Sequence, residues 1–156
     1  MHEPYASRCI ALSLYPFTRT LADFWRSPKY QFSCVNLRRL KPEPTPALHC
    51  WSSDRARDTV LCRLRLGLIL NGHMHRINRA DSPRCPAGCV DFESVEHFLL
   101  HCPAYSSERS ALAFGVRQLI PDVDLDVELL LGSSAPASVR SSILSLVYLF
   151  YLRCNR

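Results

Sequence analysis

Three cysteines and one histidine occur together in the sequence at spacings typical of metal ligands. They follow the pattern Cys-x3-Cys-x7-His-x4-Cys, formed by Cys85, Cys89, His97 and Cys102. Thiolate and imidazole are ligands that zinc prefers, and three thiolates with one imidazole complete a tetrahedral shell without a position for water. The sequence therefore predicts a structural Zn²⁺ site at these four residues.

Three alternatives to this ligand set remain open at the level of sequence. His101 competes with His97, four residues away, but His97 is favoured because His101 directly precedes Cys102 and would crowd the shell. The eight cysteines of the chain would also permit a disulfide framework, or simply unrelated buried thiols. Residues 1–20 contain no secretory signal, so we expect an intracellular, reducing compartment, the nucleus or cytoplasm, and a protein that is not secreted.

The elements that must position these ligands are a loop and a helix. Residues 82–89 include two prolines and a glycine, which predict a turn-rich loop around the first two cysteines. Residues 93–100 have Val95, Phe98 and Leu99 at helical spacing, so we expect a helix that carries His97. Cys102 would then lie where this helix ends.

Helices are also predicted on both sides of the cluster. One is capped by Ser53 or Asp54 and continues past Gly67, since a single glycine does not end a helix, and Asn71-Gly72 after it indicates a turn. Another opens at Pro103. Its expected core positions are Tyr105, Ala111, Leu112 and Val116, and its expected solvated positions are Glu108 and Arg109.

These patterns predict a mostly α fold in three segments. Residues 1–47 form an irregular basic arm with a proline-rich linker, residues 48–118 a zinc-stapled helical module, and residues 119–156 an acidic loop with an apolar C-terminal helix. The apolar run at 143–152 is far shorter than the roughly 20 residues of a membrane span, so we expect no membrane partner. This run could instead lie in the core or face a protein partner.

Basic residues are concentrated in the first half of the chain. The net charge is +5, and residues 53–84 contain seven arginines against three acidic residues. Arginines can bind phosphates, although a solvated helix face is an equally good interpretation. The candidate nucleic-acid contacts are Arg63, Arg65, His75 and Arg76. Arg63 and Arg65 are two positions apart, so on a helix they cannot share a face.

A longer string of motifs resembles a known family. Residues 64–67 (LRLG), 70–77 (LNGHMHRI), 80–86 (ADSPRCP) and 93–105 (ESVEHFLLHCPAY), followed by Arg109, are similar to the zinc-binding module that follows the polymerase in non-LTR retrotransposon reverse transcriptases. The resemblance covers residues 53–115. One departure is the first cysteine pair, which is separated by three residues where the family commonly has two.

The resemblance implies a role in handling RNA or DNA without catalysis. The Asp-Asp pair that the family's polymerase uses to hold magnesium does not occur in this sequence, and a polymerase, ribonuclease H or nuclease domain is not expected. The sequence thus predicts a non-enzymatic remnant of a retrotransposon protein. Two alternatives are a protein-interaction module that docks through the C-terminal helix and an inert transposon-derived product.

Overall fold

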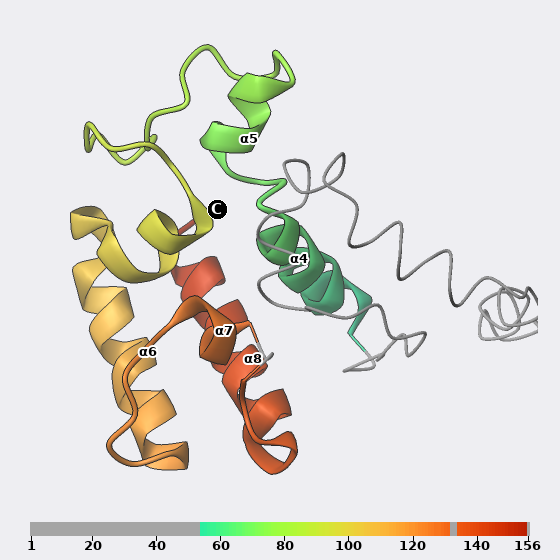
Figure 1. The fold of residues 1–156 in the computed structure, drawn as a ribbon, viewed down its shortest axis with the longest axis vertical. Coiled ribbons are helices and arrows are strands. Elements are labelled where there is room, and N and C mark those ends of the chain that lie inside the picture. The colour runs from blue at the N-terminus through green and yellow to red at the C-terminus, as the bar shows by residue number, and fades with distance from the viewer. Residues whose placement is uncertain (1–53, 132–133, 156) are drawn as a thin grey trace, which may run out of the picture. The chain divides into compact units, whose positions relative to one another are not determined.

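The computed structural model describes residues 54–131 and 134–155, and the predicted basic arm at 1–47 lies outside them. The described residues are mostly α-helical and contain no strand, apart from one isolated antiparallel bridge, which confirms the predicted fold class. The elements, shown in Figure 1, are helices α4 (Arg55–Leu66), α5 (Asn71–Arg76), α6 (Ser106–Leu119), α7 (Val127–Leu130) and α8 (Ala137–Arg153), the π-helix η3 (His97–His101) and the 3-10 helix η4 (Pro103–Tyr105).

Helix α4 has a strong signal at each end. The carboxylate of Asp54 accepts a hydrogen bond from the backbone N–H of Ala56 at 2.8 Å, so the predicted cap is confirmed. The expectation that Gly67 lies within the helix is wrong. Gly67 adopts a left-handed φ of 71°, and its N–H bonds to the carbonyl of Leu64, which closes the helix. Leu68 therefore lies beyond the helix and is exposed.

The expected turn at Asn71-Gly72 is instead the first turn of α5. The backbone N–H of Asn71 donates to the buried carboxylate of Glu93 at 2.5 Å, which supplies the cap that no neighbouring residue offers. Gly72 allows close contact with the chain opposite: a Cβ there would lie 2.5 Å from Cζ of Phe92. This helix start depends on residues about twenty positions away, and a local turn signal does not include them.

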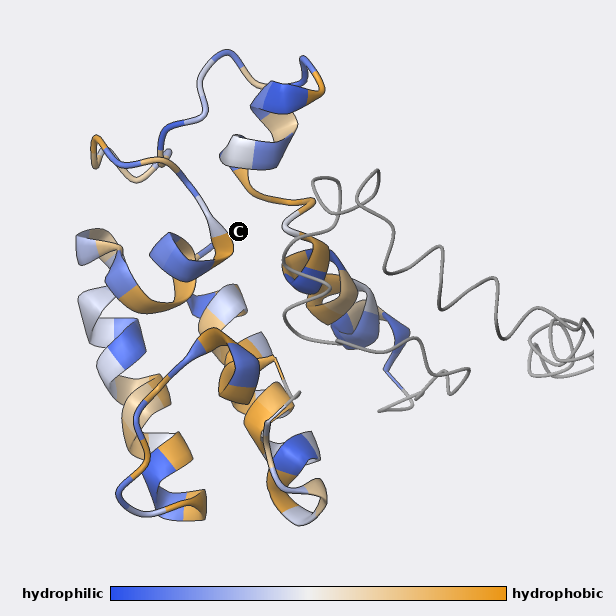
Figure 2. Ribbon diagram, in the orientation of Figure 1, coloured by the Kyte–Doolittle hydropathy of each residue, from blue (hydrophilic) through white to orange (hydrophobic). Residues whose placement is uncertain are grey.

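The hydrophobic core is built mainly by α6 and α8, which lie side by side (Figure 1). Of the positions predicted on α6, Leu112 and Val116 are buried, whereas Ala111 is exposed. The buried side chains of α8 are Ile143, Leu144, Val147 and Phe150. In Figure 2, α8 is largely apolar, whereas α5 is mostly hydrophilic.

The C-terminal apolar helix is confirmed as α8, and it has more apolar residues than the core can cover. Leu149 and Leu152 are each 48% exposed. Helix α8 also contacts α4, where Nη1 of Arg57 donates to the hydroxyl of Ser145 at 2.6 Å. In the described ranges, no helix combines the length and the apolar character required to cross a membrane.

Candidate metal centre

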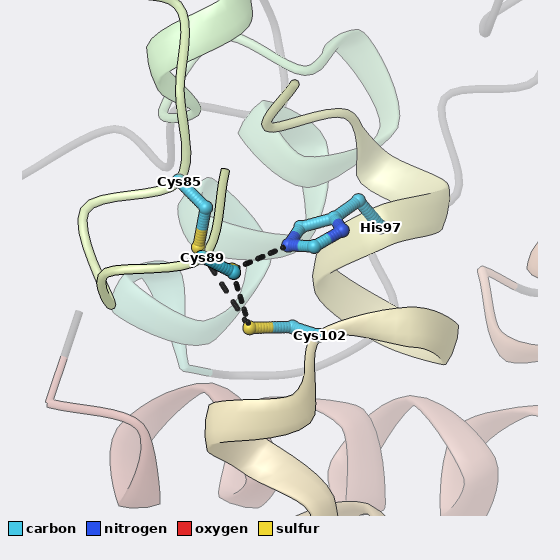
Figure 3. A group of neighbouring side chains, drawn as sticks. All are labelled: Cys85, Cys89, His97 and Cys102. Carbon is cyan, nitrogen blue, oxygen red and sulfur yellow. Dashed lines mark hydrogen bonds between the residues drawn. The ribbon is translucent and has the colours of Figure 1, made fainter. Parts of the chain in front are cut away.

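The four cysteine and histidine residues singled out in the sequence converge at one point (Figure 3). Sγ of Cys89 lies 3.2 Å from Nε2 of His97 and 3.6 Å from Sγ of Cys102, which is itself 3.7 Å from Sγ of Cys85. All four ligand atoms lie within 4.8 Å of one another. The sulfurs are much farther apart than the roughly 2.05 Å of a disulfide. The group could hold a metal ion.

The first two cysteines are placed by a tight hairpin-like loop. The N–H of Cys85 donates to the carbonyl of Asp91 at 3.0 Å, and Arg84 forms the isolated bridge with Phe92. At the loop tip Gly88 has φ 89°, while a Cβ there would meet nothing within 4 Å. Glycine is therefore needed for its left-handed backbone rather than for space. This is the turn-rich loop that the sequence predicts over residues 82–89.

The other two ligands are placed by a π-helical turn. The N–H of Cys102 donates to the carbonyl of His97 at 2.7 Å, which closes a turn over five residues. In an α-helix, residues five positions apart lie about 140° apart around the axis, so a wider turn is needed to bring them together. The predicted helix over 93–100 is thus correct in place but wrong in type, and it begins only at Val95.

The competing ligand His101 lies outside the cluster. Its imidazole is exposed, and Nε2 lies 4.0 Å from Oε1 of Glu96. His97, by contrast, is buried against the sulfurs. The structure therefore groups His97, and not His101, with the three cysteines.

A carboxylate that the sequence analysis did not single out supports His97. Oδ2 of Asp91 lies 3.7 Å from Nδ1 of His97, the ring nitrogen that faces away from the sulfurs. A carboxylate at this position favours a proton on Nδ1, which leaves the lone pair of Nε2 free to bind a metal. Asp91 is two residues from Cys89 and carries no periodic signal, so only its position between ligands could have indicated this role.

Arg109 is a second supporting residue, and the expectation that it is solvated is wrong. Its guanidinium donates from Nε to the carbonyl of Leu99 at 3.0 Å and from Nη2 to the carbonyl of Cys102. Carbonyls at a helix end lack partners within the helix, and the fork of arginine donors can bond two of them. Arg109 thereby ties the helix end that carries Cys102 to α6.

The environment of Cys85 favours its neutral thiol. Burial, and secondarily hydrogen bonding to the neighbouring thiols, raises the pKa of Cys85 to about 12. A thiolate is the form that binds a metal, so the ion must displace this proton and offset the negative charge. Without a metal ion, the negative charge of a deprotonated Cys85 would be unfavourable in its buried surroundings.

The candidate nucleic-acid residues are not arranged as one stripe. Arg63, His75 and Arg76 are exposed. The guanidinium of Arg65, in contrast, donates through Nε and Nη2 to the carbonyl of Leu131, and burial lowers its pKa to about 10. Arg65 thus has a structural contact, whereas the other three side chains are exposed.

Fold and site together define a small helical protein with a Cys3His group that could hold a metal ion. No model of a known protein family, no curated protein and no solved structure matches the chain.

Proposed function

We propose that the chain is a non-catalytic zinc module, related to those of non-LTR retrotransposon reverse transcriptases, that binds RNA or DNA. The observation that carries the metal part of the proposal is the spacing of the ligand atoms. A tetrahedral zinc ion with Zn–S bonds of about 2.3 Å sets its sulfurs about 3.8 Å apart. The two sulfur–sulfur contacts involving Cys102 measure 3.6 and 3.7 Å.

The donor chemistry also favours zinc. Three thiols and an imidazole suit zinc, whereas magnesium and calcium require oxygen ligands. Four protein ligands fill a tetrahedral shell, so no position would remain where a water or a substrate could be activated. The role inferred for the ion is structural: it would tie the loop at Cys85 and Cys89 to the helix end at Cys102.

The nucleic-acid part of the proposal is supported by the motif string and by charge. The ligands lie within the sequence block that resembles the retrotransposon module, and that block includes His75 and Arg76. Both residues are exposed, as is Arg63. Exposed cations of this kind bind phosphates and release counterions, which makes binding depend on salt.

Zinc content and a salt-titrated binding curve test the two parts separately. The purified chain is expected to hold about one zinc per molecule, and less than about 0.2 would refute the metal site, since a closed four-ligand site should fill. Exchanging both Arg63 and Arg76 for Gln should weaken binding and lower the salt slope by about two. The matched control is Arg117→Gln, because Arg117 is exposed on α6. Affinity that does not change with salt would contradict phosphate contacts.

A protein-interaction module is the second candidate, and the exposed apolar residues of α8 favour it. Leu149 and Leu152 are each 48% exposed, and Leu149 lines a hollow of about 170 Å³ between α6 and α8. If this candidate is correct, Leu152→Glu should abolish binding to a protein partner. The Arg63 and Arg76 exchanges should leave that binding unchanged.

A further inference from the structure

An arginine and a phenylalanine lie opposite each other on the loop that carries the first ligands. Arg84 and Phe92 face each other across the isolated antiparallel bridge. Residues directly opposite in such a pair project their side chains to the same face. Arg84 is exposed, and Phe92 is 54% exposed although it is a large apolar residue.

Both residues have fixed backbones. The carbonyl of Arg84 accepts a hydrogen bond from Nδ2 of Asn71 at 3.0 Å. The ring of Phe92 lies so close to Gly72 that a Cβ on Gly72 would overlap it, which places the ring against the start of α5. The ring is therefore supported on one side and open to solvent elsewhere. An exposed ring held in this way is preorganised for a ligand.

Arginines near the pair can contact the phosphates of a ligand. The segment from 71 to 92 contains three exposed arginines and two exposed carboxylates. The arginines are Arg76, Arg79 and Arg84, and the carboxylates are Asp81 and Asp91. Aromatic rings interleaved with cations are characteristic of surfaces that bind single-stranded nucleic acid.

We propose that Phe92 stacks on an unpaired base and that Arg84 contacts an adjacent phosphate of a single-stranded polynucleotide. This inference rests on the proposed nucleic-acid function and specifies its ligand. Stacking requires the face of a base to be accessible, as it is in a single strand and is not inside a duplex. Loss of one stacked base weakens binding by about tenfold.

The test uses the zinc-loaded full chain with labelled RNA and DNA of one sequence, each single-stranded and as a duplex. Phe92→Leu keeps an apolar side chain beside Gly72 but removes the aromatic ring. It should weaken single-strand binding by about tenfold and leave the salt slope unchanged. The matched control is Phe114→Leu, because Phe114 is 67% exposed on α6.

Arg84→Gln gives a second, independent measurement, because it changes an exposed side chain and leaves the ring in place. It should lower the single-strand salt slope by about one. A loss on either RNA or DNA supports the proposal and identifies the sugar that is preferred. The proposal is overturned if the slope is unchanged, or if Phe92→Leu weakens duplex and single-strand binding equally. Wild-type protein that binds none of the probes at low salt refutes the proposed function itself.

Discussion

The loop at residues 71–92, which carries Cys85 and Cys89, and the helical core of α6 and α8 are stabilised in different ways. Between residues 71 and 92 only Gly72 and Cys85 are buried, and neither has a large apolar side chain. Helix α8 alone buries four large apolar residues. The core is thus stabilised by hydrophobic burial, while the loop depends on hydrogen bonds and on its ligand atoms. A segment with so little apolar burial needs another source of stability, and the Cys3His group is placed to supply it.

The π-turn that carries the other two ligands contacts the core directly. The ring of Phe98, next to His97, lies with its centroid 5.3 Å from that of Phe150 on α8. On the other side, Arg109 of α6 bonds the carbonyl of Cys102. The ligands on the π-turn are therefore anchored to the core, whereas Cys85 and Cys89 reach it through the loop. We expect the two regions to respond differently when metal binding or core packing is disturbed.

Removal of zinc should have the largest effect, and it should be local. Apparent binding free energies of structural zinc sites are about 10 kcal/mol or more, which exceeds the stability of many small domains. Chelation, or Cys89→Ser, should increase hydrogen exchange throughout residues 71–102, while amides of α6 and α8 stay protected longest. The control is Cys62→Ser, an exposed cysteine on α4 outside the cluster. Uniform loss of protection would show that the regions are one cooperative unit.

Truncation in the core should give the opposite pattern with a smaller effect. Leu144 on α8 is fully buried, so Leu144→Ala removes packed methyl groups and leaves a cavity. The free energy of unfolding in urea should fall by about 2–5 kcal/mol, while the folded protein still binds one zinc. Leu152→Ala, on the exposed face of the same helix, should change stability little. Loss of zinc from folded Leu144→Ala protein would contradict the separation of the regions.

The sequence was most informative where function depends on residue type and spacing. The Cys-x3-Cys-x7-His-x4-Cys pattern indicated the four residues that the structure brings together. The preference for His97 over His101 followed from crowding next to Cys102, and the structure agrees. The mostly α class and the apolar helix α8 were likewise accessible, because both depend on local periodicity.

Several features that were missed depend on contacts that the pattern of apolar residues does not show. A hydrophobic period of 3.6 residues gives no sign of the π-turn that begins at His97. This turn has one residue more than an α-helical turn, brings His97 and Cys102 together, and is followed by Pro103. Asn71 was predicted to lie in a turn because its hydrogen-bond partner, the carboxylate of Glu93, is far away in the sequence. Arg109 was predicted to be solvated because the sequence does not show that the carbonyls of Leu99 and Cys102 lie beside α6. Asn71 and Arg109 are polar residues whose hydrogen-bond partners cannot be identified from their neighbours in the sequence.

The smallest predicted effect concerns the carboxylate beside His97. Asp91→Asn removes the negative charge 3.7 Å from Nδ1 but keeps the size of the side chain. Such outer partners change metal affinity by about 10- to 100-fold, and the exposure of Asp91 places this case near tenfold, about 1.4 kcal/mol. Competition with a chromophoric chelator measures this ratio directly.

The matched control for that measurement is Asp81→Asn, because Asp81 is an exposed aspartate outside the Cys3His group. It has the same charge change without the contact to the ring. If both variants lower zinc affinity equally, the effect is general electrostatics and Asp91 does not orient His97. If only Asp91→Asn does so, the loop contributes a supporting group as well as two ligands, and its role in metal binding extends beyond its cysteines.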